Sequence, residues 1–261
     1  MPELPDVEAY RRFLSEHAAG RRIDRVVVTD AGILRNASAR TLDRALRGHR
    51  FGEPGRHGKW LIAVTTGPQV LLHFGMTGEF GWGDAANGRH RHDRVIFELD
   101  RGELRYRNMR KLGGLWLAHD DREAADLMGP LGPDALALDR RGFRTALAGR
   151  RGRIKAVLMN QAVIAGIGNL LADEILWQGR VHPARRLESL APEELDRVHA
   201  KLRHVVRTAV ERFDYVPRLR GWLSHVRAQP GARCPRCRTP LERTVIGGRT
   251  TWYCPSCQPA P

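Results

Sequence analysis

The sequence predicts an α+β protein of several domains, and three observations support that prediction. Apolar and polar residues alternate through much of the first half, which favours β-strands. Apolar residues recur at helical spacing through much of the second half, and all four cysteines lie near the C-terminus. We therefore expect an N-terminal β-sandwich or barrel with a flanking helix, then a helical domain and a small cysteine-rich domain.

The chain is predicted to begin with a helix. Pro5 suits the first position of a helix, where its missing N–H costs nothing, and Asp6 lies at the positive end of the helix dipole. Apolar residues then recur at helical spacing as far as Gly20, which indicates an amphipathic helix packed on a core. Removal of the initiator methionine would expose the secondary amine of Pro2 beside the carboxylate of Glu3.

Six segments of the first half are predicted strands. Several of them alternate apolar and polar residues, and glycine-containing turns lie between them. They span residues 22–30, 59–65, 69–78, 93–100, 103–109 and 113–118. Beyond them, prolines and glycines interrupt both periodicities over residues 127–139. This stretch is the predicted linker.

The second half is predicted to be mainly helical. Apolar residues recur at helical spacing over residues 153–161, 169–178 and 191–213. Residues 213–233 show no regular pattern. The predicted domains are residues 1–126, 140–226 and 227–261, with 127–139 as linker. Nothing in the sequence indicates oligomerisation, so a monomer is expected.

The cysteines form two C-x2-C pairs, CPRC and CPSC, separated by sixteen residues. This spacing is typical of a tetrahedral thiolate zinc site. Four protein ligands leave no open position for catalysis, so we expect one structural Zn²⁺. Two disulfides are the alternative, which a reducing compartment disfavours. The expected ligands are Cys234, Cys237, Cys254 and Cys257.

The formal net charge is +15 at pH 7, which favours a polyanionic partner because bound cations displace counterions from phosphates. A ribosome-associated or membrane-surface protein would carry a similar charge. No apolar stretch approaches the roughly 20 residues that span a bilayer, and the N-terminus is too acidic for a signal peptide. An intracellular, cytoplasmic location is expected.

Several motifs together resemble those of one family of repair enzymes. They are MPELPDVE at the start, GKWL around Lys59, LLHFGMTG, HDRVIFEL, NMRKLGG, IKAVLMNQAVIAGIGNLLADEILWQGRVHP and GGRTTWYCPSCQ. Over nearly its whole length the chain resembles the formamidopyrimidine-DNA glycosylase / endonuclease VIII family of bifunctional DNA glycosylases. The resemblance implies a β-sandwich, a helix-two-turns-helix domain and a zinc finger. It also implies damaged double-stranded DNA as partner and association with the nucleoid.

The resemblance implies that Pro2 is the nucleophile of a DNA glycosylase and AP lyase of base excision repair. An α-amine has a pKa of about 8, so a useful fraction is unprotonated at neutral pH. Pro2 would release an oxidised or ring-opened base through a Schiff base, and β,δ-elimination would nick the strand. Glu3 would move protons at the sugar, as its family counterpart does. From the residues alone, Pro2 and Glu3 fit an ordinary helix approach equally well.

Two basic residues also match catalytic positions of the family. Lys59 would contact phosphate or the lesion and assist proton transfer, although its position also fits a solvated strand end. Arg249 would lie at the tip of a hairpin over residues 241–253, where Gly247 and Gly248 permit a tight turn. There it would grip phosphate and help the second elimination.

Three residues match side chains with which the family fills the space left by an extruded base. They are Met76, Arg110 and Leu112. A core position is the alternative for Met76. In the family an Arg-Phe pair is common where Lys111 and Leu112 stand, so the wedge here would be aliphatic.

Other positions match DNA-contacting residues of the family. His73 and His92 resemble DNA-contacting histidines, with ordinary turn histidines as the alternative. Arg151 stands where the family has a phosphate-binding lysine. Asn169 would bind the phosphate beside the lesion and cap the second helix of the pair, with the acidic residues 173–174 bracing that junction.

Further departures from the family pattern concern the lesion. Asp6 replaces the usual Glu, which keeps the charge with a shorter reach. Residues 214–232 form a shorter segment than the one that covers a flipped 8-oxoguanine in the family, so the resemblance does not carry recognition of that lesion over to this chain. Oxidised pyrimidines, ring-opened purines, abasic sites and bulkier lesions all stay open as substrates. Leu4 favours the formamidopyrimidine branch. The alternatives to an enzyme are a lesion-binding protein of the same fold and a basic zinc-ribbon protein of another pathway, which would not explain the N-terminus.

Overall fold

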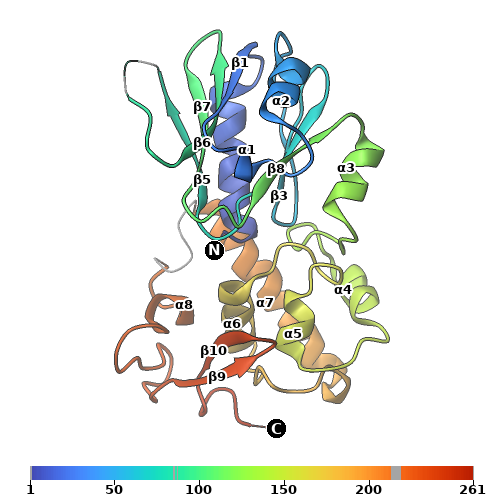
Figure 1. Ribbon diagram of the computed structural model, residues 1–261. Coiled ribbons are helices and arrows are strands. Elements are labelled where there is room, and N and C mark those ends of the chain that lie inside the picture. The colour runs from blue at the N-terminus through green and yellow to red at the C-terminus, as the bar shows by residue number, and fades with distance from the viewer. Residues whose placement is uncertain (1, 85, 87, 213–218, 261) are drawn as a thin grey trace. The chain divides into compact units, whose positions relative to one another are not determined.

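The computed structural model describes residues 2–84, 86, 88–212 and 219–260 and divides into two compact units (Figure 1). Unit 1 consists of the chain start and Asp6–Pro130. Unit 2 consists of Glu3–Pro5 and Leu131–Pro261. The predicted domain boundaries at residues 126, 139 and 226 stay predictions.

Unit 1 is a β-sandwich of two antiparallel four-stranded sheets, which confirms the sandwich rather than the barrel. One sheet has the strand order β1-β6-β7-β5. These strands are Ile23–Val28, Asp93–Leu99, Glu103–Asn108 and Gly78–Gly83. The other has the order β2-β3-β4-β8. Its strands are Gly55–His57, Trp60–Ala63, Gln69–His73 and Gly114–Ala118.

The predicted strand over residues 69–78 is wrong in its second half. Strand β4 ends at His73, and a turn precedes β5. Gly75 has φ +60°, and a Cβ there would lie 2.5 Å from the backbone nitrogen of Gly113. The turn therefore packs directly against the loop before β8, which a side chain at position 75 would prevent.

Unit 1 contains α1 (Leu4–Ala18) from Asp6 onward, α2 (Ala39–Leu46) and α3 (Asp121–Met128), with a 3-10 turn at Ala31–Ile33. Because α1 begins at Leu4, Pro5 is its second residue and not its first. Apolar side chains of α1, α2 and both sheets form one core. Helix α3 packs on a second cluster, which includes Leu71 and Ala118.

Unit 2 is helical around one core, as the sequence predicts. Its helices are α4 (Arg140–Leu147), α5 (Ile154–Met159), α6 (Asn169–Gln178), α7 (Pro192–Glu211) and α8 (Leu223–Val226), with a 3-10 turn at Leu187–Ser189. Helix α8 lies inside the segment predicted to be irregular, of which residues 213–218 are outside the described residues. None of the described helices is both long and apolar enough to cross a bilayer.

The C-terminal part of unit 2 contains the predicted hairpin, formed by β9 (Glu242–Ile246) and β10 (Arg249–Tyr253). Gly247 and Gly248 connect the strands with φ of 57° and 70°, as a two-residue type I′ turn requires. The indole nitrogen of Trp177, on α6, donates to Cys234 Sγ at 3.4 Å. The cysteine-containing segment that precedes the hairpin is thus anchored to α6.

Candidate functional site

Glu3 binds the N-terminus of α6. Its side chain is buried, and its carboxylate accepts three backbone N–H bonds. Oε1 accepts from Leu170 at 2.8 Å. Oε2 accepts from Gly168 at 2.9 Å and from Leu171 at 3.1 Å. These donors, together with the positive end of the helix dipole, stabilise and orient the carboxylate.

Two glycines of the GIGN motif allow this contact. A Cβ at Gly168 would lie 2.2 Å from Glu3 Cδ, which no side chain tolerates. Gly166 has φ +108°, and a Cβ there would lie 2.5 Å from Leu4 Cδ1. The backbone nitrogen of Leu4 also donates to the carbonyl of Gly166 at 3.1 Å. Residues 3–5 therefore lie directly on the loop before α6.

Asn169 is the first residue of α6, but its side chain does not cap the helix. The predicted capping role is wrong, because Glu3 supplies the cap instead. Asn169 Oδ1 accepts from Lys155 Nζ at 2.7 Å, and Nδ2 donates to the carbonyl of Thr250 at 3.0 Å. The amide is thereby held between α5 and β10.

Lys155 belongs to a buried cluster of titratable side chains, for which the sequence predicted a bracing role of Asp173 but no role of Lys155. Its Nζ lies 2.7 Å from Asp173 Oδ1 and donates to Thr251 Oγ1 at 2.6 Å. Asp173 Oδ2 accepts from Arg227 Nη1 at 2.6 Å and from the backbone nitrogen of Trp252 at 3.2 Å. Burial lowers the pKa of Lys155, and the charge of Asp173 opposes that shift. The cluster joins α5, α6, β10 and the segment after α8.

One signal could have identified Lys155. The chain contains 44 Lys and Arg residues, of which only four are lysines. Each lysine is therefore a candidate for a position at which an amine is required and a guanidinium is not suitable. Both side chains of the Lys155–Asp173 pair are fully buried. The carbonyl of Thr250 also accepts from Lys155 Nζ at 3.3 Å, and a compact ammonium fits these close oxygen atoms better than a planar guanidinium does. The predicted bracing role of Asp173 agrees with these contacts.

Glu174 is buried in the same helix. Its carboxylate accepts from Gln178 Nε2 at 2.8 Å and from the backbone nitrogen of Ser224 at 2.9 Å. Burial raises its pKa from 4.5 to about 7, although both hydrogen bonds oppose the shift. Glu174 therefore links α6 to the start of α8. Its raised pKa means that it changes protonation state near neutral pH.

We expect Glu174 to make the free energy of unfolding fall as the pH rises from about 4.5 to about 7. In that window the folded protein holds a proton that the unfolded chain has lost, so raising the pH disfavours folding. The slope is at most about 1.4 kcal/mol per pH unit. Urea unfolding across this range should show a flatter profile for Glu174→Gln than for the wild type. Parallel profiles would contradict the assignment.

Arg249 begins β10 directly after the two-glycine turn, and its side chain is exposed. Its backbone carbonyl accepts from Thr251 Oγ1 at 3.1 Å, so the same threonine contacts both Lys155 and the hairpin tip. The tip therefore presents a cation to solvent on a fixed backbone. This placement agrees with the prediction of an outward-facing arginine.

We expect Arg249→Gln to weaken DNA binding uniformly across sequences and to reduce the slope of log affinity against log salt by about one. The family resemblance implies that Arg249 contacts one phosphate, and this variant would remove that contact. Fluorescence anisotropy with one duplex at several salt concentrations measures both. Arg238→Gln, at an exposed arginine elsewhere in unit 2, is the matched control. An unchanged slope for Arg249→Gln would exclude a phosphate contact.

In unit 1, His73 ends β4 and pairs with Trp60 of β3, the residue after Lys59. Burial, and secondly the charge of Lys59, lower the pKa of His73. Nδ1 of the neutral ring accepts from the backbone nitrogen of Gly75 at 3.2 Å. The proton is therefore on Nε2, where it can be donated to a phosphate oxygen.

Met76, Arg110 and Leu112 lie on two turns of unit 1 that contact each other. Met76 is 40% exposed and Leu112 is 55% exposed, so the core alternative for Met76 is wrong. Arg110 Nη1 lies 3.3 Å from Met76 Sδ, and its backbone nitrogen donates to Thr77 Oγ1 at 3.1 Å. The structure thus brings the predicted wedge residues together.

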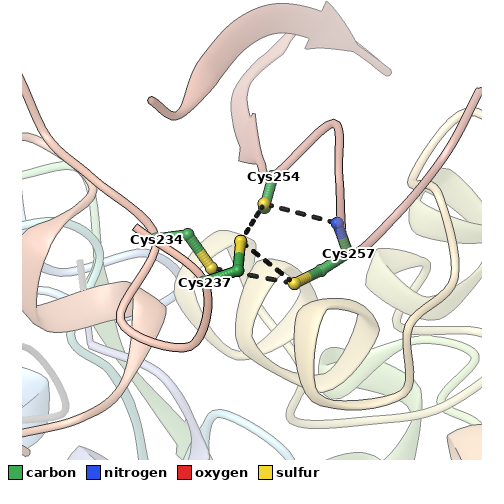
Figure 2. Close-up of side chains that lie close together, drawn as sticks. All are labelled: Cys234, Cys237, Cys254 and Cys257. Atoms are coloured by element: carbon green, nitrogen blue, oxygen red, sulfur yellow. Dashed lines mark hydrogen bonds between the residues drawn. The ribbon is translucent and has the colours of Figure 1, made fainter. Parts of the chain in front are cut away.

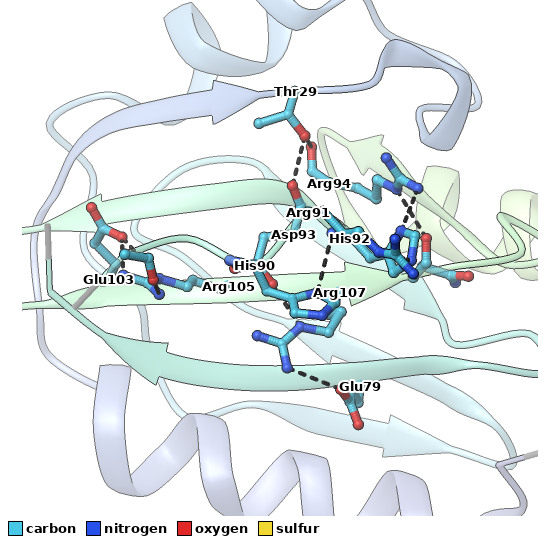
Figure 3. Close-up of polar contacts among 12 residues, drawn as sticks. Thr29, Glu79, His90, Arg91, His92, Asp93, Arg94, Glu103, Arg105 and Arg107 are labelled. Atoms are coloured by element: carbon cyan, nitrogen blue, oxygen red, sulfur yellow. Dashed lines mark hydrogen bonds and ion pairs between the residues drawn. The ribbon is translucent and has the colours of Figure 1, made fainter.

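His92 lies in a cluster of arginines on β6 and β7 and the turn before them (Figure 3). Arg91 Nε donates to its Nε2 at 3.1 Å, and Arg94 Nη2 is 3.0 Å from its Nδ1. Its partial burial and the neighbouring cations lower the pKa of His92. Arg107 binds Asp93 at 2.8 Å on the same sheet. Arg107 also lies 3.2 Å from Glu79, and Arg94 lies 3.5 Å from Asp30, so carboxylates balance much of the positive charge of the cluster.

Arg151 is exposed in the loop between α4 and α5. The loop contains two glycines with positive φ, Gly149 at 70° and Gly152 at 114°. The backbone nitrogen of Gly152 donates to Glu188 Oε2 at 3.1 Å, which ties the loop to the 3-10 turn. Arg151 therefore projects from a constrained loop.

The four cysteine sulfurs lie within 4.8 Å of one another (Figure 2). Cys237 Sγ is 3.4 Å from Cys254 Sγ and 3.5 Å from Cys257 Sγ, and Cys234 Sγ is 3.9 Å from Cys257 Sγ. Tetrahedral Zn–S bonds of about 2.3 Å place sulfurs about 3.8 Å apart. A disulfide needs about 2.0 Å, and all four cysteines are free. The donor set fits one structural zinc ion and not two disulfides.

Comparison with known sequences assigns the same order of parts. The Formamidopyrimidine-DNA glycosylase N-terminal domain matches residues 1–115, the Formamidopyrimidine-DNA glycosylase H2TH domain matches 131–216, and the zinc finger found in FPG and IleRS matches 231–260. The formamidopyrimidine-DNA glycosylase of Symbiobacterium thermophilum is 37% identical over 281 residues, covering 100% of this chain and 90% of the relative. The chain belongs to the formamidopyrimidine-DNA glycosylase family. A Desulfitobacterium hafniense member is 32% identical, covering 99% of this chain and all of that protein.

Solved structures of this family have the same fold. The Lactococcus lactis enzyme bound non-covalently to DNA containing an AP site is 26% identical, with a TM-score of 0.90 over 99% of this chain and 100% of that one. Its complex with DNA containing N7-benzyl-Fapy-dG gives a TM-score of 0.89 at the same identity and coverage. The chain is accordingly a DNA glycosylase of base excision repair with AP lyase activity, and its zinc finger holds the zinc ion.

Proposed function

We propose that Pro2 is the nucleophile with which this glycosylase excises an oxidised or ring-opened base. The fixed carboxylate of Glu3 is the observation that carries the proposal. Three backbone N–H bonds orient it on α6, and the peptide bond keeps the amine of Pro2 one residue away. A nucleophile and a proton-transfer group at such short range suit covalent catalysis at one carbon atom.

In the first step the Pro2 nitrogen forms a bond to C1′ of the damaged nucleotide while the bond from C1′ to the base breaks. The base leaves with the bonding electron pair and takes up a proton from solvent. Glu3 transfers the amine proton of Pro2 to O4′, so that the C1′–O4′ bond breaks and an iminium remains between Pro2 and C1′. Loss of a C2′ proton then expels the 3′ phosphate, and a second elimination expels the 5′ phosphate. Water releases the sugar fragment and regenerates the amine.

The remaining predicted residues would hold the extruded nucleotide and its strand. Met76, Arg110 and Leu112 would fill the space in the duplex, because their side chains are exposed and held together. Basic and amide side chains would bind the phosphates. We assign that role to Lys59, His73, His92, Arg151, Asn169 and Arg249.

The proposed substrates are oxidised or ring-opened bases. The short segment 214–232, of which residues 214–218 lie outside the described residues, gives no support for 8-oxoguanine as the preferred lesion among them. The proposed place of action is inside the cell, where binding to damaged DNA associates the protein with the nucleoid. A monomer suffices, since every proposed residue belongs to one chain.

Borohydride trapping tests the proposal. The purified zinc-loaded protein is incubated with a duplex containing one abasic site, reduced, digested and mapped by mass spectrometry. We expect a covalent adduct on Pro2 when the intact mass shows that Met1 has been removed. The matched control is the same protein with Met1 retained, which should give no adduct. No adduct from the processed protein would overturn the Pro2 mechanism and leave a lesion-binding protein of this fold.

A further inference from the structure

Large apolar side chains are exposed at four positions of the described part of the chain, and three of them lie on the two joined turns of unit 1. Met109 is 53% exposed beside Met76 at 40% and Leu112 at 55%. Thr77 Oγ1 lies 3.1 Å from Asn108 Oδ1, which connects the two turns. Two exposed thioether side chains thus lie on two turns that are joined by hydrogen bonds.

We propose that Met76 and Met109 are oxidation sites, at which conversion of the thioether to the sulfoxide weakens binding of damaged DNA. The proposal rests on the void-filling role proposed above for Met76. The oxidant is a hydroperoxide such as hydrogen peroxide. A sulfur lone pair bonds to one peroxide oxygen, the O–O bond breaks, and the other oxygen leaves as water after proton transfer. Sulfur loses two electrons and the peroxide gains them.

The surroundings of the two sulfurs predict an order of reaction. Met76 Sδ accepts a hydrogen bond from Arg110 Nη1 at 3.3 Å, which occupies one lone pair. Met109 is more exposed. Thioether oxidation requires a free lone pair and access for the oxidant. Met109 is therefore expected to be oxidised first and Met76 second.

The contact between Met76 and Arg110 makes oxidation at Met76 doubly unfavourable for DNA binding. A thioether sulfur is a weak acceptor, whereas a sulfoxide oxygen is a strong one. The sulfoxide would hold the guanidinium of Arg110 on the protein surface. It would also place a polar group where an apolar side chain should enter the base stack. One added oxygen therefore affects two of the three proposed wedge residues.

The chain provides its own reference methionines. Met128 is half-buried against the cluster beneath α3, and Met159 is half-buried against the core of unit 2. Neither belongs to the proposed DNA-binding residues. Their oxidation rates report the general exposure of this protein to peroxide.

The test treats the zinc-loaded protein with hydrogen peroxide and follows each methionine by peptide mass spectrometry. We expect the sulfoxides at positions 76 and 109 to form at least about threefold faster than those at 128 and 159. Affinity for a duplex with an abasic-site analogue is measured before and after treatment. A loss of roughly tenfold is expected for the wild type, reversed by methionine sulfoxide reductases.

Each protein is compared with itself before treatment, so a change in starting affinity does not matter. The double variant Met76→Leu/Met109→Leu should lose less than about twofold, because leucine stays apolar and cannot form a sulfoxide. Zinc release is followed in parallel, since both proteins carry the same four cysteines. Equal losses in the two proteins, or equal oxidation rates at all four methionines, would overturn the proposal.

A separate variant distinguishes failure of the void-filling role from failure of the oxidation site. Met76→Ala removes the wedge side chain without any oxidant. If it binds the abasic duplex as tightly as the wild type, the proposed function of Met76 is wrong. If it binds weakly but peroxide has no selective effect on the wild type, the oxidation proposal alone is wrong.

Discussion

Replacing Glu3 with glutamine is expected to slow base release about 10²- to 10⁴-fold, because the variant loses the proton-transfer group at the sugar. The side chains have nearly the same shape, so the N-terminus should stay on the loop before α6. A glutamine side chain has one oxygen, however, and can accept hydrogen bonds on that side only. Its NH₂ group would face the backbone N–H groups that the other carboxylate oxygen of Glu3 now binds. Single-turnover excision from a damaged duplex measures the effect.

The matched control is Glu16→Gln, the same exchange at an exposed position of α1. It should excise at the wild-type rate. Thermal unfolding of both variants reports how far the loss of one or two hydrogen bonds destabilises the fold, which we expect to be about 1–3 kcal/mol for Glu3→Gln. If Glu3→Gln lost stability but excised at the wild-type rate, Glu3 would be a helix cap and not a catalytic residue.

The contact between Glu3 and α6 could not be predicted from the sequence. Proximity of Pro2 and Glu3 follows from the peptide bond, and the start of α6 at Asn169 follows from helical spacing. The carboxylate and the N–H groups that it binds are separated by 165 residues or more. No local sequence pattern indicates such a contact. The local sequence therefore favoured Asn169 as the cap of α6, whereas the structure has Glu3 in that role.

Short helices were missed for a related reason. Helices α2, α3 and α4 have eight residues each, so few apolar positions mark their period, whereas the six-residue α5 was predicted as part of the longer pattern over residues 153–161. Each is started by a side-chain cap, from Ser38, Asp120 and Asp139. Such residues also begin turns, so the cap is recognised only once the following residues are seen to be helical. The long helix α7 and the Gly-Gly hairpin carried stronger signals and were predicted.

The buried cluster around Asp173 was also beyond local patterns, because its three charged residues come from distant segments. Its carboxylate is fully buried between Lys155, also fully buried, and Arg227, which is 8% exposed. Asp173→Ala would leave two cations facing each other without a counter-charge. We expect a loss of about 3–5 kcal/mol in the free energy of unfolding, measured with urea.

Asp196 is the matched control for Asp173, because it too lies between two cations, Arg140 and Arg144. Its side chain is 27% exposed, so water replaces the carboxylate when it is removed. Asp196→Ala should therefore cost at most about 1 kcal/mol. Similar losses for the two variants would mean that the Asp173 cluster is as accessible to water as the surface pair. A larger loss at Asp173 would show that burial of Lys155 and Arg227, rather than the number of ion pairs, makes this carboxylate necessary for holding β10 on α6.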